Sequence, residues 1–221
     1  MDAPAALASP RLQRLAQRPS SPPQREPREQ CELCGRPIPA EHRHVLDLRD
    51  RNLLCACRPC ALLFDRRAAG GGHWRLVPER RLRLDGFQMP DELWERLRIP
   101  VDMAFFFNNT SAQRVMAYYP SPMGPTESQL ELDAWDELEA SNEILRTLEA
   151  DVEALLVNRA RGRRRTWLVP IEDCYALVAV IRTRWRGFSG GREVWEELDR
   201  FYAELDRKSK AAPAGAEERR S

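Results

Sequence analysis

The sequence lacks both an excess of charge of one sign and a long apolar run. Its 35 Lys and Arg residues face 34 Asp and Glu residues, which leaves a net charge of +1. Such a balance gives no whole-chain attraction to nucleic acid or to an anionic membrane surface. The longest strongly apolar run, residues 175–181, is far shorter than the roughly 20 residues that cross a bilayer. We therefore expect no membrane span, and any polyanionic partner would have to bind a local basic patch.

Histidine is also scarce, since the chain contains only His42, His44 and His73. We find no Ser/His/Asp set, P-loop or dinucleotide-binding fingerprint. His73 follows three glycines and is expected in a solvated loop, whereas Cys174 lies in an apolar helical stretch and is expected in the core. These observations predict a protein that is not an enzyme.

Both ends of the chain are poor in apolar residues. Residues 1–29 are rich in Pro, Arg, Ala and Ser, and they lack the apolar core and the cleavage site of a secretory signal. We expect a disordered tail there and a second one at residues 208–221. Without an export signal, we expect the protein in the cytoplasm, where closely spaced cysteines are more often metal ligands than disulfides.

Five of the six cysteines, by contrast, lie between residues 31 and 60. Two CxxC pairs, Cys31/Cys34 and Cys57/Cys60, match the spacing of structural zinc sites with four cysteines. Gly35 permits the tight turn that brings backbone amides close to sulfur. A closed tetrahedron of thiolates predicts a structural zinc ion. Iron stays open as the alternative, because paired CxxCG knuckles also bind iron in rubredoxin-like proteins, although the second knuckle, "CRPCA", lacks the glycine.

Cys55 is in excess of this set of four. On a strand, Cys55 and Cys57 project to the same face, so Cys55 could lie near the metal without binding it. We expect it to be a small apolar residue in the core of a hairpin. His42 and His44 are alternative ligands in a mixed Cys/His set, but four cysteines already complete the tetrahedron.

The pattern of the remaining residues predicts an α+β fold. Knuckle, β-hairpin (residues 42–57), knuckle and a helix ended by glycines 70–72 form a small treble-clef-like zinc module over residues 30–72. A mixed α+β domain is expected over residues 73–207. In chain order, this domain is expected to contain strands within 74–78 and 81–89, a helix from Pro90, a hairpin over 101–120, a helix over 126–148 that breaks near Asn142, a hairpin over 152–170, and helices over 171–185 and 192–208.

Two further segments could contact partners. The basic run at residues 159–165, "RARGRRR", could meet phosphate, but we expect a solvated turn neutralised by the acidic segment 127–153. Aromatic residues beside glycines in "YYPSPMG" and "RWRGFSGG" are of the types enriched at interface hot spots. The candidate interaction loops thus contain Tyr118, Tyr119, Trp185, Arg186 and Phe188.

The module's plan resembles the scaffold of HNH nucleases, but the helix after the second knuckle, "ALLFDRR", holds no histidine for catalysis. The combination of "CELCG", "CRPCALLF", "FFFNNT", "YYPSPMGPTES" and "DCYALVAVIRTRWRGFSGG" resembles an uncharacterised bacterial protein family encoded beside uptake NiFe hydrogenase genes. The likeness covers nearly all of the chain between the tails, and the family's knuckles match Cys31, Cys34, Cys57 and Cys60. The resemblance implies that the protein acts in the same pathway as the hydrogenase, but it implies no particular chemical activity.

Three functions follow as hypotheses. The first is a non-enzymatic, zinc-binding accessory or assembly protein that contacts a hydrogenase subunit or maturation factor. The second is a rubredoxin-like electron carrier with iron in the four-cysteine site. The third, a nucleic-acid-binding zinc module, depends only on the knuckles and the basic run, and we do not expect it.

Overall fold

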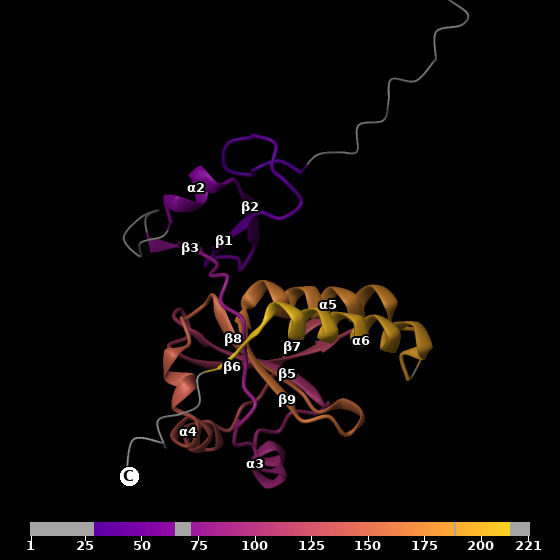
Figure 1. Cartoon of the computed structure of the whole chain (residues 1–221). Coiled ribbons are helices and arrows are strands. Elements are labelled where there is room, and N and C mark those ends of the chain that lie inside the picture. The colour runs from indigo at the N-terminus through magenta and orange to yellow at the C-terminus, as the bar shows by residue number, and fades with distance from the viewer. Residues whose placement is uncertain (1–28, 65–71, 188, 213–221) are drawn as a thin grey trace, which may run out of the picture.

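The computed structural model describes residues 29–64, 72–187 and 189–212. Within these ranges the chain forms a small sheet with one short helix, followed by a larger sheet with helices on both of its faces (Figure 1). The mixed α+β class predicted from the sequence is confirmed. The predicted tails fall mostly outside the described residues. None of the helices described is both long enough and apolar enough to cross a membrane.

The small sheet contains strands β1 (Arg43–Asp47), β2 (Leu53–Ala56) and β3 (Trp74–Leu76) in the order β2-β1-β3, all antiparallel. Helix α2 (Arg58–Leu62) follows β2. The predicted hairpin and the start of the helix are therefore confirmed. The strand at residue 74 was expected in the second domain, but it pairs with β1 instead, with Val45 opposite Leu76. This pairing satisfies the backbone groups on the second edge of β1.

The large sheet has seven strands in the order β10-β4-β9-β8-β5-β6-β7. All of its neighbours are antiparallel except β10 and β4. The strands are β4 (Leu82–Arg83), β5 (Met103–Asn109), β6 (Arg114–Ser121), β7 (Gly124–Ser128), β8 (Glu153–Asn158), β9 (Arg165–Pro170) and β10 (Lys210–Ala211).

Helices cover both faces of the large sheet (Figure 1). Helices α5 (Ile171–Arg184) and α6 (Gly191–Lys208) pack on one face, and α3 (Asp91–Arg96) and α4 (Leu132–Ser141) pack on the other. The described residues also contain the 3-10 turns η2 (Glu143–Thr147) and η3 (Ala160–Gly162).

The central strands of the large sheet, β5, β8 and β9, are buried on both faces, which explains their continuous hydrophobic runs. Phe105 and Phe107 lie in the core under α5 and α6, whereas Phe106 lies between them in sequence and packs in the core under α3 and α4. In β9, Trp167 and Leu168 divide between the two cores in the same way. The period-two alternation of a strand thus fills two separate cores.

Two predicted boundaries need correction. Residues 126–128 were expected to begin a helix but belong to β7, which pairs with β6, and α4 begins only at Leu132. Lys210 and Ala211 were expected in the C-terminal tail but pair with β4. In each case a neighbouring strand with free backbone groups offers hydrogen bonds, and local propensity does not register these tertiary partners.

The small sheet packs directly against the large domain. Alternate residues of β1 divide between the two parts, because Val45 is buried in the small module's own cluster and Leu46 is buried in the core beneath α5. Across the same boundary, Arg51 contacts Asp151 (Nη1 to Oδ1, 3.2 Å), and His44 contacts Glu172 (Nδ1 to Oε2, 2.7 Å). The boundary therefore combines apolar contacts with polar contacts to buried or half-buried carboxylates.

Candidate metal centre

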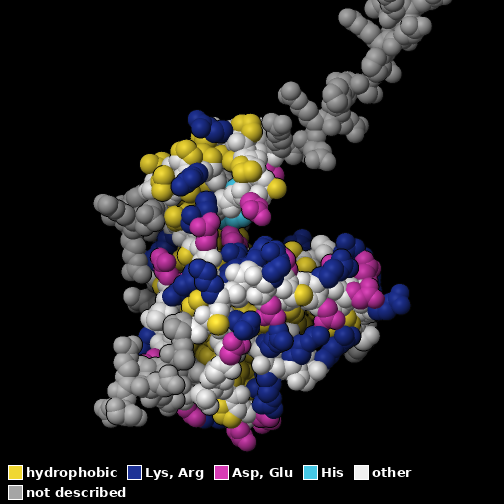
Figure 2. All heavy atoms as spheres, in the orientation of Figure 1, with side chains coloured by type: hydrophobic (Ala, Val, Ile, Leu, Met, Phe, Trp, Pro, Cys, Tyr) yellow, Lys and Arg dark blue, Asp and Glu magenta, His cyan; other side chains and the backbone are white. Residues whose placement is uncertain are grey.

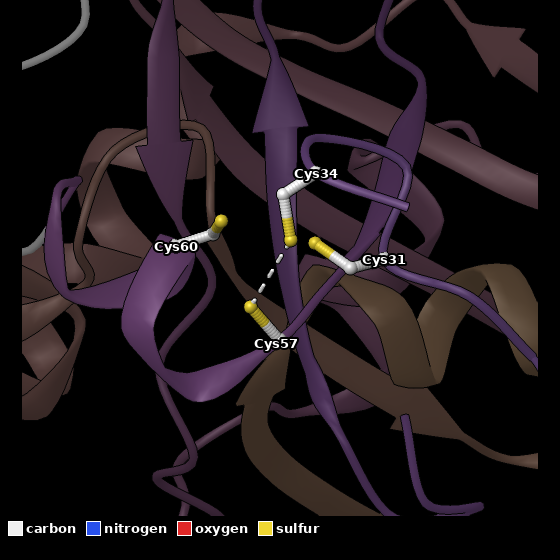
Figure 3. Close-up of side chains that lie close together, drawn as sticks. All are labelled: Cys31, Cys34, Cys57 and Cys60. Atoms are coloured by element: carbon white, nitrogen blue, oxygen red, sulfur yellow. Dashed lines mark hydrogen bonds between the residues drawn. The ribbon is translucent and has the colours of Figure 1, made fainter. Parts of the chain in front are cut away.

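The first CxxC pair lies in a tight turn that precedes β1. The amide of Gly35 donates to the carbonyl of Cys31 (2.7 Å), and the amide of Cys31 donates to the carbonyl of Arg36 (2.8 Å). Gly35 has a φ of +72°, a left-handed conformation that glycine adopts without steric cost. The turn holds Cys31 and Cys34 with their sulfurs directed toward the second pair (Figure 3).

The second CxxC pair is fixed by the start of α2. Cys57 immediately precedes the helix, and its carbonyl accepts a hydrogen bond from the amide of Ala61 (2.9 Å). Cys60 lies within the helix, where its carbonyl accepts from the amide of Leu63 (3.1 Å). A helical turn thus replaces the glycine turn of the first knuckle, which explains why "CRPCA" needs no glycine.

The structure brings these four thiols together. The sulfurs of Cys31, Cys34, Cys57 and Cys60 all lie within 4.8 Å of one another, and those of Cys34 and Cys57 are 3.7 Å apart (Figure 3). All four cysteines are free. Zn–S bonds of about 2.3 Å in a tetrahedron place sulfurs about 3.8 Å apart. The cluster therefore has the dimensions of a four-thiolate metal site, and it could hold a metal ion.

The four thiols affect one another's ionisation. Burial raises the pKa of Cys31, but hydrogen bonds from the backbone amides of Cys57 and of the first knuckle have a larger effect in the opposite direction. The net result is a pKa lowered to about 6. The neighbouring thiols of Cys57 and Cys34, together with burial, raise the pKa of Cys60 to about 12. One thiolate thus opposes the ionisation of the next. A divalent cation would offset this repulsion and displace the remaining protons.

Cys55, His42 and His44 form a second group, which the sequence pattern does not predict. Cys55 packs against Cys31, Ile38 and Cys57 in the core of the module, in agreement with the expectation, and it is half-buried and also lies beside the two histidines. Neither histidine belongs to the four-thiol cluster. The available signal was the cross-strand register, since His44 lies directly opposite Cys55 in the hairpin.

The candidate interaction residues have different environments. Tyr118 and Tyr119 were assigned to a loop, but both lie in β6, where Tyr118 stacks on Phe105 at 5.8 Å between ring centroids. Met123, in the turn between β6 and β7, is exposed.

The second predicted loop joins α5 to α6. The indole of Trp185 donates to the carbonyl of Gly187 (2.9 Å), and its ring lies 3.1 Å from where a Cβ would project at Gly190. Trp185 therefore shapes this turn, whereas Arg186 is exposed. Phe188 lies outside the described residues. The role of these side chains in partner contact stays a prediction.

Most arginines of the basic run pair with acidic residues within the chain, but these are not the acidic residues that were predicted. Arg163 pairs with Asp199 of α6 (2.7 Å) and Arg164 pairs with Asp91 of α3 (2.6 Å). Arg165 contacts Asp206 of α6. The acidic residues come from helices that flank the β8–β9 turn in space, so the expected pairing with residues 127–153 is replaced.

Comparison with known proteins identifies a family for this chain, and that family has no assigned activity. No curated protein and no solved structure matches the chain. A family of unknown function (DUF5947) matches residues 30–209, which include all four cysteines of the cluster and both sheets except strand β10. The chain, with its four-thiol cluster joined to a seven-stranded α+β domain, therefore belongs to the DUF5947 family of unknown function.

Proposed function

We propose that this protein is a zinc-binding accessory or assembly protein, in which Cys31, Cys34, Cys57 and Cys60 hold a structural Zn²⁺. The observation that carries the proposal is the mutual approach of the four thiols from two separate knuckles. Four protein thiolates leave no position for water or substrate, so the ion stabilises structure. The order of knuckle, hairpin, knuckle and helix supports a treble-clef-like module over residues 30–72, extended by β3, and a separate α+β domain to residue 207.

The zinc ion would then hold a surface suited to protein contact. Figure 2 shows hydrophobic side chains gathered over the small module. Leu62 and Leu63, at the end of α2 in this module, are 65% and 63% exposed. Exposed apolar groups of this kind are common at protein-binding surfaces. Met123, in the turn beside Tyr119, is 96% exposed and adds a second candidate contact on the domain.

The partner in this proposal is a hydrogenase subunit or maturation factor. Its support is the resemblance in the knuckles and in "YYPSPMGPTES" and "DCYALVAVIRTRWRGFSGG" to a family encoded beside uptake NiFe hydrogenase genes. The contact residues in this proposal are Tyr118, Tyr119, Trp185, Arg186 and Phe188.

An iron-containing electron carrier is the second candidate, because the same four-thiolate geometry suits both ions. Visible absorption separates the two, since a ferric tetrathiolate is coloured and zinc is not. Protein purified from its native host should be colourless and contain one tightly held zinc ion per chain by elemental analysis. A stoichiometric iron content with visible absorption would replace zinc by iron in this proposal.

The ligands are tested by substitution in the same preparation. Changing Cys57→Ser and Cys60→Ser together should remove the tightly held ion, whereas Cys55→Ser should keep it. If the metal survives the double change, the four-cysteine assignment is wrong. Proteins that co-purify with the wild type and not with the double variant identify the partner, and co-purification of hydrogenase components is the expected result.

A further inference from the structure

His42, His44 and Cys55 lie together on one face of the β1–β2 hairpin. His42 precedes β1 and His44 lies within it, so their side chains share a face by strand alternation. Cys55 of β2 is the direct cross-strand partner of His44. One ring nitrogen from each histidine and the sulfur of Cys55 lie within 4.8 Å of one another, and the two imidazole centroids are 4.7 Å apart.

The imidazole of His42 is buried with one nitrogen unsatisfied. Its Nδ1 lies 3.0 Å from the carbonyl of Pro39 and 3.2 Å from that of Ala40. Carbonyl oxygens only accept, so Nδ1 carries the proton and Nε2 offers a lone pair. The side chain is 7% exposed, and Nε2 has no hydrogen-bond partner among the described residues. An unsatisfied buried nitrogen of this kind needs an explanation, and an ion is one.

His44 is oriented by a carboxylate. Its Nδ1 lies 2.7 Å from Oε2 of Glu172 on α5, and the other oxygen of Glu172 accepts from Arg81 (2.8 Å). A carboxylate that binds one imidazole nitrogen fixes the tautomer and leaves the other nitrogen as a more basic ligand. Both histidines therefore use Nδ1 for protein contacts and keep Nε2 available.

We propose that His42, His44 and Cys55 form a second metal site, which takes a borderline-soft divalent transition ion such as Zn²⁺. Two imidazoles and one thiolate are ligands that such ions prefer. Three protein ligands leave a fourth position for water or another small ligand, so this site is open where the four-thiolate site is closed. An ion here can exchange without loss of the structural ion.

The second site lies where the small module contacts the large domain, so an ion bound there would affect that contact. Glu172 belongs to α5 of the large domain, whereas the three ligands belong to the small module. An ion bound to Nε2 of His44 would strengthen the hydrogen bond from Nδ1 to Glu172. Occupancy of the site would therefore tighten the contact between the module and the domain.

The test uses the full chain loaded with one equivalent of Zn²⁺ and titrated with Co²⁺ as a spectroscopic probe. We expect one further ion, with the weak thiolate charge-transfer band of a single cysteine. His44→Ala and Cys55→Ser should each abolish this second binding, while His73→Ala, a histidine outside the group, should leave it unchanged. Glu172→Gln should weaken it by about 10–100-fold, the usual effect of removing the carboxylate behind a histidine ligand.

Retention of the first Zn²⁺ and an unchanged far-ultraviolet circular dichroism spectrum show that each variant is folded. If a folded Cys55→Ser protein still binds the second Co²⁺ with wild-type affinity, or if the wild type binds none, the proposal is overturned. If His44→Ala fails to fold, the milder Cys55→Ser and Glu172→Gln variants decide the question. The experiment is independent of the hydrogenase partner, because no partner is present in it.

Discussion

The small module and the large domain are stabilised by different interactions. The module has only two small buried clusters of its own, one of Val45, Ala56, Ala61 and Phe64 and one of Cys31, Ile38 and Cys57. The domain fills two cores, one on each face of its sheet, with aromatic and aliphatic side chains from five or more elements. A core as small as the module's cannot offset the conformational entropy of folding without a further constraint, and a metal ion is the usual one in such modules.

Metal removal should therefore give the largest difference in stability between the two parts, because it should unfold the module and leave the domain folded. Structural Zn²⁺ contributes an apparent binding free energy of roughly 10–16 kcal/mol in small zinc modules, which exceeds the stability of many whole domains. After chelation, amide hydrogen exchange should lose protection in β1, β2 and α2 and keep it in β5 and β8. Unchanged protection across residues 42–64 would show that the module does not depend on the metal.

A substitution in the core under α3 and α4 should have the opposite effect. It should destabilise the domain and leave zinc binding by the module unchanged. Phe106 is fully buried and stacks on Trp135 of α4 at 5.4 Å between ring centroids. Phe106→Ala should lower the free energy of unfolding by about 3–5 kcal/mol, because it leaves a cavity under α3 and α4. The thermal transition of the domain should fall by several degrees.

Metal binding provides the second measurement on this variant. Phe106 does not contact the module's cluster, so the native protein should still hold one zinc ion per chain. Met123→Ala, at an exposed apolar position, is the control and should change neither quantity. Loss of zinc from folded Phe106→Ala would mean that the module is not independent of the domain.

Removing a charged contact between the module and the domain should lower the free energy of unfolding by less than Phe106→Ala does. Asp151 is fully buried, and its carboxylate accepts from the amide and hydroxyl of Thr110 (3.0 and 2.6 Å) and contacts Arg51 at 3.2 Å and Arg75 at 3.8 Å. Asp151→Asn preserves the shape and tolerates the left-handed φ of +70° at this position. It leaves two arginines without their anion and should cost about 1–3 kcal/mol.

This variant tests how the two parts are coupled. Hydrogen exchange should increase first in residues 48–52, the turn that carries Arg51, and not in β6 or β7. Asp102→Asn is the matched control, because Asp102 is exposed and should leave both regions unchanged. A uniform increase across the whole chain would instead show that the parts unfold together.

The sequence predicts the four thiols well because CxxC spacing and the turn at Gly35 are local properties. Hairpins are predicted for the same reason, since alternation of apolar residues and a turn lie within one short segment. The pairing of β3 with β1 and of β10 with β4 depends on contacts between distant segments, which local pattern does not encode. The His42, His44 and Cys55 group was missed because a one-residue shift of the hairpin register would move Cys55 to the opposite face.

The smallest effect on stability is expected at the proposed partner surface. Met123 and Arg186 are both exposed, and the described side-chain contact of Arg186 is with the backbone carbonyl of its neighbour Trp185 (3.1 Å). Changing Met123→Ala and Arg186→Ala together should alter the free energy of unfolding by less than about 0.5 kcal/mol, as usual for exposed positions. The same change should weaken capture of the partner from native-host extract, because exposed Met and Arg are enriched at binding interfaces.

Tyr118→Ala and Trp185→Ala are the informative contrast. Tyr118 stacks on buried Phe105, and Trp185 shapes the turn at Gly190, so each change should lower the thermal transition. If both exposed residues are changed and the partner is still captured, the contact lies elsewhere, and the exposed Leu62 and Leu63 of the module become the next positions to alter. If capture is lost while the thermal transition stays at its wild-type value, the two exposed turns of the domain form part of the binding surface.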